Sequence, residues 1–179
     1  MIRTKEQLEY YINEDSKANG IQMGIKYWVK LLYGNVPSCA FRYLKSLRKY
    51  EYYHNTGNIL AIWYRFYNRR LGLKYNLAMP INKIGPGLYL PHIEGGVIIN
   101  CESVGANCMI NSGVVVGNKH DNEQVPTIGD NVQLAVGCKV IGKIKVGNNV
   151  IVAPNAVVVK DVPDNAVVGG VPAKVIKYR

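Results

Sequence analysis

His92 is the residue whose type and setting most clearly offer chemistry, within the segment "LYLPHIEGGVIIN" at residues 88–100. It follows a proline and comes shortly before a Gly-Gly pair, so the chain is expected to turn here and leave the imidazole at the surface. An imidazole can take a proton from a hydroxyl near neutral pH and then give it to a leaving group. We predict that His92 is a general base; the alternative is an exposed histidine beside a turn.

Two other side chains are candidates for the same site. Glu94 is predicted to contact the substrate. It is also one of three candidates to hold the second ring nitrogen of His92, with Asn76 and a backbone carbonyl, and the sequence leaves that choice open. His120 lies in the polar segment "GNKHDNEQVPT" at residues 117–127. We predict that it contacts the substrate; the alternative is a solvated loop residue.

An internal repeat of six residues must position these side chains. From residue 84 onward, aliphatic residues recur six or twelve positions apart. Those expected to point inward in this phase are Ile98, Val104, Ile110, Val116, Ile128, Leu134, Val140, Val146, Val152 and Val158. Short strands joined by tight turns, three to a coil, would stack them in one interior column. The repeat therefore predicts a left-handed parallel β-helix, an exception to the usual right-handed crossover.

Three departures from the repeat are expected to carry the function. The step from Leu90 to Ile98 is eight residues instead of six, so two extra residues bulge out near His92. The segment 117–127 lacks the expected aliphatic residue. The tail "VPDNAVVGGVPAKVIKYR" ends the regular coils with two prolines and a Gly-Gly pair. Because a regular solenoid is only a scaffold, its irregular positions are where a site belongs.

The N-terminal part of the chain has a different composition. Fifteen of the 17 Phe, Trp and Tyr residues lie before residue 76, and apolar residues recur there at spacings of three and four. That periodicity predicts amphipathic helices, with Arg48 among the residues on their polar sides. The fold class is therefore mainly β, with an α-helical N-terminal region. We expect two domains: residues 1–75, and residues 76–179 with the β-helix and its tail.

Most of the positive charge belongs to the helical part, which holds 14 Lys and Arg residues against 5 acidic ones in residues 1–83. One interpretation is helices packed on the prism or on a neighbouring subunit, with their charges in water. The other is contact with an anionic membrane surface. The residues expected to make that contact are Trp63, Phe66 and Tyr67 beside Arg65, Arg69 and Arg70. No nucleic-acid recognition motif accompanies the charge, so nucleic acid is not an expected partner.

Several classes of protein are disfavoured by the composition. No apolar run approaches the length of a membrane span, and the N-terminus lacks the apolar core of a signal peptide. We therefore expect a cytoplasmic protein, peripheral to the membrane if the contact described above forms. Four cysteines have no metal-type spacing and are expected to be thiols that serve packing. No metal is expected: a γ-class carbonic anhydrase needs three zinc-binding histidines on the prism, whereas His54 lies in the helical part.

Residues 84–176 resemble the hexapeptide-repeat acyltransferases through the motifs "IGPGLYLPHIEGGVIIN" and "GGVPAKVI". The resemblance is greatest to the serine acetyltransferase branch and its relatives in polysaccharide gene clusters. It implies acetyl-CoA as the donor, a homotrimer, an active site between neighbouring prisms and direct transfer to a hydroxyl. His92 matches the catalytic histidine of the family. The resemblance also implies that Gly117, Ala135 and Ala153 line the groove for the donor's pantetheine arm and that Lys174 meets a phosphate of the coenzyme.

Departures from the family pattern bear on the acceptor. Serine acetyltransferases have an Asp before the catalytic histidine, where this chain has Pro91, and an Arg-His pair where it has Gln124 and Val125. The Asp that orients the imidazole falls on Leu77. Since an amino acid needs partners for both charges, a sugar or surface-polysaccharide hydroxyl is the expected acceptor. The alternatives are a serine O-acetyltransferase of cysteine biosynthesis and a non-catalytic structural or binding β-solenoid.

Overall fold

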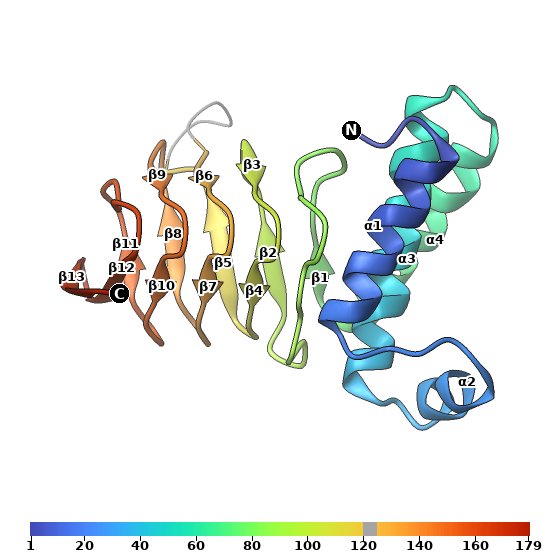
Figure 1. The fold of residues 1–179 in the computed structure, drawn as a ribbon, viewed down its shortest axis with the longest axis horizontal. Helices are drawn as coiled ribbons and strands as arrows, with labels where there is room; N and C mark the ends of the chain where they lie inside the picture. Colours follow the sequence, from blue (N-terminus) through green and yellow to red (C-terminus); the bar gives the residue numbers. More distant parts are fainter. Residues whose placement is uncertain (120–124) are drawn as a thin grey trace.

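The computed structural model describes residues 1–119 and 125–179 of the chain. In these residues four helices precede the strands, namely α1 (Lys5–Ala18), α2 (Ile25–Leu32), α3 (Val36–Asn55) and α4 (Leu60–Tyr75). Helices α1, α3 and α4 pack side by side at one end of the molecule, and α2 lies beyond them (Figure 1). None of the helices in the described ranges is long and apolar enough to cross a membrane.

Short strands form the three faces of a triangular prism (Figure 1). Face A contains β1 (Leu77–Ala78), β2 (Val97–Ile99), β5 (Val114–Gly117), β8 (Lys139–Ile141) and β11 (Val157–Val158). Face B contains β3 (Ser103–Val104), β6 (Thr127–Ile128) and β9 (Lys145–Val146). Face C contains β4 (Met109–Ile110), β7 (Gln133–Leu134), β10 (Ile151–Val152), β12 (Ala166–Gly170) and the antiparallel β13 (Ala173–Tyr178). The predicted fold, a left-handed parallel β-helix with an α-helical N-terminal region, is confirmed.

The six-residue repeat places its aliphatic residues in the interior, as predicted. Val116, Val140 and Val158 pair in register on face A and are almost wholly buried. Ile98 is the exception: it is 53% exposed, and Ile99 pairs with Val116 in its place. The step from Leu90 to Ile99, the next inward residue, is therefore nine residues. The step from Ile99 to Val104 is one residue shorter than the repeat. The prediction for Ile98 was wrong because spacing alone does not show where a bulge restores the register.

Small residues let successive coils stack closely at the edge between faces B and C. Gly85, Gly105, Gly129 and Gly147 lie one above another, and a Cβ added at Gly105 would lie 2.6 Å from the backbone of Gly129. Asparagines take positive φ angles at the same edge, and their side chains form a ladder in which Asn131 donates to Asn149 and Asn149 to Asn165. Asn tolerates this conformation because its amide bonds locally.

A buried charged cluster joins the helices to the first coil. Arg48 is completely buried and donates to the carboxylate of Asp15 at 2.9 Å and to the carbonyl oxygens of Ile84 and Gly85, both at 2.7 Å. Burial raises the pKa of Glu51, against the opposing effect of the Arg48 guanidinium 3.4 Å away. The expectation that Arg48 lies on a polar side in water was wrong, because Asp15 and the carbonyls of Ile84 and Gly85 come from segments distant in the sequence.

The four cysteines are free and buried, as expected for residues that serve packing. Burial raises the pKa of the thiols of Cys101 and Cys138 to about 12 and that of Cys108 to about 11. A thiol is nucleophilic as its thiolate, so these three are poorly suited to nucleophilic chemistry near neutral pH.

We predict that Arg48→Met lowers the free energy of unfolding by about 3 to 5 kcal/mol, because it leaves two carboxylates buried without their cation. Chemical denaturation followed by circular dichroism measures the loss. Lys17→Met is the control, since it breaks only an exposed ion pair with Glu14. A triple variant that adds Asp15→Asn and Glu51→Gln should recover part of the loss. An Arg48→Met variant as stable as the control would contradict the prediction.

We also predict slow thiol modification of the folded protein. At pH 8 a thiol with a pKa of about 12, such as that of Cys138, is ionised to about one part in 10⁴. A colorimetric disulfide reagent should therefore titrate all four cysteines in denaturant and react far more slowly without it. Rapid modification of Cys101, Cys108 or Cys138 in the native protein would refute the burial seen in the structure.

Candidate active site

His92 lies on a bulge at the edge between faces C and A, which we call the first edge. The chain leaves face C after Leu90 and joins face A at Val97, whose N–H donates to the carbonyl of Asn76 at 2.9 Å. Between them Ile93 is buried and anchors the bulge, whereas the His92 side chain is 64% exposed. The imidazole is thus presented to solvent by a fixed backbone, as predicted from the sequence.

Glycine is required where the bulge meets the next coil. The N–H of Gly95 donates to the Ser112 hydroxyl at 2.8 Å, and a Cβ at Gly95 would lie 2.4 Å from that oxygen. Gly96 has a φ of 79°, in the left-handed region that favours glycine. The group that approaches this Gly-Gly pair closely is therefore Ser112 of the next coil.

Glu94 is the candidate partner that the structure brings next to the imidazole. Its Oε2 lies 3.9 Å from Nδ1 of His92 and accepts the N–H of Ile93 at 2.9 Å. The backbone hydrogen bond fixes the carboxylate on the Nδ1 side of the ring. This arrangement leaves Nε2 facing away from Glu94.

Three of the predicted donor contacts lie along the same first edge. Ala135 follows β7 and Ala153 follows β10, so they stack in register below the bulge. Lys174 in β13 is exposed and pairs with Gly169, the next residue in this column. From His92 to Lys174 there are five strand spacings of about 4.8 Å, or roughly 24 Å. The first edge is thus a continuous track from the histidine to a terminal lysine.

The backbone along this track is already hydrogen-bonded. The N–H of Ala135 donates to Val152 and that of Ala153 donates to Val168, at 3.0 and 2.8 Å. These two amides are therefore engaged within the prism. Because their side chains are single methyl groups, Ala135 and Ala153 allow a ligand to approach the backbone closely.

Gly117 lies apart from the other candidates. It ends β5 at the edge between faces A and B, which we call the second edge, and a Cβ built on it would meet open space. His120 and Gln124 fall in residues 120–124, outside the described residues, and Val125 follows them at the same edge. One protomer therefore does not bring Gly117 to the His92 bulge.

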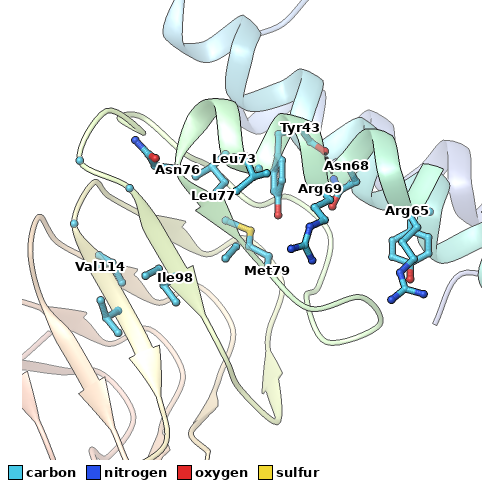
Figure 2. A pocket seen from close by; sticks show the side chains of 17 residues that line it. Tyr43, Arg65, Asn68, Arg69, Leu73, Asn76, Leu77, Met79, Ile98 and Val114 are labelled. Carbon is cyan, nitrogen blue, oxygen red and sulfur yellow. Dashed lines mark hydrogen bonds between the residues drawn. The ribbon is translucent and has the colours of Figure 1, made fainter. Parts of the chain in front are cut away.

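A large cavity of about 660 Å³ lies between α4 and face A. Figure 2 shows Arg65 and Arg69 on α4 at one end of it and Ile98 and Val114 on the strands at the other. Gly95 and Gly96 of the bulge also line it. Most of its wall is apolar, so it suits the side chains of a packing partner better than a small polar acceptor.

A second cavity of about 340 Å³ lies beside the bulge and combines charges of both signs. Glu94 lines it from the prism, whereas Arg42 on α3 and Lys74 on α4 line it from the helices. Arg42 and Lys74 were not among the site residues predicted from the sequence, in which they lie 52 and 20 residues before Glu94. Their spacing on amphipathic helices gave no sign that they would meet the β-helix.

Comparison with known proteins matches both the repeat and the fold. Residues 126–160 match the family model described as bacterial transferase hexapeptide (six repeats). Serine acetyltransferase of Synechococcus elongatus is 38% identical over 102 residues, which are 56% of this chain and 41% of that protein. Serine acetyltransferase of Staphylococcus aureus strain Mu50 is 40% identical over 100 residues, 55% of this chain and 47% of that protein. The matched region is thus less than half of each relative.

Solved structures extend the similarity to almost the whole chain. The serine acetyltransferase of Neisseria gonorrhoeae in complex with serine has a TM-score of 0.75 and 27% identity, over 95% of this chain and 69% of that one. A serine acetyltransferase in complex with CoA has a TM-score of 0.69 over 96% of this chain and 71% of that one, at 21% identity, a likeness of fold. The resemblance drawn from the sequence is confirmed: the chain is similar to hexapeptide-repeat transferases in residues 126–160 and to serine acetyltransferases over a longer part of its length.

Proposed function

We propose that the chain is an acetyl-CoA-dependent O-acetyltransferase with His92 as the general base. The observation that carries the proposal is the exposed imidazole at the head of the first edge, above Ala135, Ala153 and Lys174. The similarity to serine acetyltransferases, one of them solved in complex with CoA, supports the same donor here. A non-catalytic solenoid would leave both the bulge and the charged cavity beside it without a role.

The proposed reaction is direct transfer between two bound substrates. Nε2 of His92 takes the proton of the acceptor hydroxyl as the oxygen attacks the thioester carbonyl carbon. The tetrahedral intermediate then breaks its C–S bond, and the leaving thiolate takes the proton from the imidazolium. The carboxylate of Glu94 lies 3.9 Å from Nδ1, on the side of the ring away from the nitrogen that takes the proton. With the pKa of Cys101, Cys108 and Cys138 raised by burial, an acetyl-cysteine intermediate is disfavoured.

A homotrimer explains how both edges can serve one site. Face A lies between the first edge and the second edge. If three prisms turn face A toward a threefold axis, the first edge of each prism lies against the second edge of its neighbour. Gly117 then reaches the donor from the adjacent subunit. The outward residues of face A support this packing: Ala78, Ile98, Val115 and Val157 are apolar, and the amine of Lys139 is turned to the Gly113 carbonyl.

L-Serine is the acceptor that the comparisons favour, in place of the sugar hydroxyl expected from the sequence. The cavity beside His92 supports it, because it offers an anion and two cations to a zwitterion. A sugar hydroxyl stays as the second candidate because Pro91 and Leu77 are uncharged where the family has carboxylates.

Contact with a membrane surface stays a prediction about the helical part. Trp63 and Phe66 on α4 are 55% and 67% exposed, and Arg65, Arg69 and Arg70 are exposed beside them. An apolar face flanked by cations is what an anionic lipid surface would require. The same face would also serve packing between subunits.

We predict that His92→Ala lowers kcat by about 10² to 10⁴ in an acetyl-CoA assay, because the hydroxyl loses its general base. The variant should fold normally, since the side chain is mostly exposed. His54→Ala, which removes an exposed histidine on α3, is the matched control and should keep full activity. If His92→Ala retains near-normal turnover, the assignment is wrong.

We further predict that L-serine is acetylated with a higher kcat/KM than free sugars, nucleotide sugars or glycan fragments. Thiol release from acetyl-CoA and mass spectrometry of the products measure this. Acetylation of a sugar with no O-acetylserine would favour the second candidate. Binding of acetyl-CoA without transfer to any hydroxyl would leave the solenoid as a binding protein.

A further inference from the structure

The cavity beside His92 is lined by charged groups of opposite sign that come from two parts of the chain. The helical pole consists of Arg42 on α3 and Lys74 on α4, and the prism pole is Glu94 on the bulge. The neighbouring lining is apolar or neutral, with Leu31, Val36 and Ile93 among its residues. The cavity therefore suits a ligand that carries both a negative and a positive group.

Arg42 is held in an orientation that suits a carboxylate. Its Nε donates to the Tyr67 hydroxyl at 2.8 Å, and its guanidinium carbon lies 5.7 Å from the centre of the Tyr67 ring. That contact raises the pKa of Arg42, so the side chain stays cationic throughout the working pH range. Tyr75, which also lines the cavity, is a second tyrosine that raises the pKa of Arg42, so a carboxylate would join the Tyr67 and Tyr75 hydroxyls as a further acceptor of the guanidinium's five N–H groups.

Glu94 links the cavity to the chemistry. Its carboxylate lines the cavity and also lies 3.9 Å from the imidazole of His92. A ligand whose ammonium group meets Glu94 is thereby placed next to the base. In an α-amino acid with a hydroxylated side chain, the hydroxyl is only two bonds from the carbon that bears this ammonium group.

We propose that this cavity is the acceptor subsite, in which Arg42 binds the α-carboxylate and Glu94 binds the α-ammonium group of a hydroxy amino acid, with Lys74 adding positive charge at the carboxylate end. The inference rests on the proposed function and specifies the residues that recognise its acceptor. It also explains how the chain compensates for the uncharged Pro91 and Leu77: the charges come from α3 and the bulge itself.

The test pairs each variant with a ligand that lacks the group concerned. Binding of L-serine, ethanolamine and 3-hydroxypropionate is measured by calorimetry on the His92→Ala protein, so that no turnover interferes. Arg42→Gln should weaken L-serine by about 10- to 10²-fold but leave ethanolamine, which has no carboxylate, unchanged. Glu94→Gln should weaken L-serine similarly but leave 3-hydroxypropionate, which has no ammonium group, unchanged. Arg65→Gln, at an exposed arginine of α4 in the other cavity, is the matched control.

The outcomes separate this inference from the proposed function. If the wild-type protein acetylates serine but Arg42→Gln binds all three ligands as tightly as the control, the subsite is wrong and the function stands. Equal losses for serine and ethanolamine would show a general disturbance and would also refute the assignment. If wild-type protein acetylates only sugars and binds no serine, the acceptor proposed above and this subsite both fail. Circular dichroism confirms that each variant is folded.

Discussion

The buried contact between Arg48 and the first coil is the constraint on which the rest of the structure depends. A β-helix exposes unpaired backbone groups and an apolar column at each open end, which must be covered. At the N-terminal end, Arg48 covers the first coil by donating hydrogen bonds to the carbonyls of Ile84 and Gly85. Asp15 accepts a hydrogen bond from the N–H of Leu88 at 3.0 Å. Tyr43 and Leu44 of α3 complete the cover by joining the apolar core. At the other end β13 folds back on β12.

This cover also determines the chemistry of the site. Because α3 is fixed on the first coil, Arg42 faces the bulge that carries His92 and Glu94. The β-helix alone would present a histidine on a smooth edge, suited to a donor that lies along Ala135 and Ala153. The helices add walls and cations beside the bulge. In the proposed function the two substrates are bound by different parts of the chain, and His92 lies where these parts meet.

The similarity to serine acetyltransferases and the departures from their pattern have a common explanation. The prism and the histidine bulge are retained, whereas the neighbouring positions Pro91 and Leu77 lack charge. Leu77 is buried in β1 and contributes to the core, so it could not hold a carboxylate there without a partner. Charges from α3, α4 and Glu94 occupy the space beside the bulge. In the proposed function, the charges that recognise the acceptor therefore come from the junction between the prism and the helices.

The sequence by itself determined the β-helix, its helical N-terminal region and the prominence of His92, because a six-residue period and a bulge are local properties that the chain displays directly. It placed Ile98 inside and Arg48 in water, and both were wrong, since a local period does not reveal a compensating shorter turn or a partner 36 residues away. Only the tertiary structure separated Gly117 from the first edge and brought Arg42 to Glu94. Those relations depend on which coil edge and which helix face meet in space, and that is decided by packing over the whole chain.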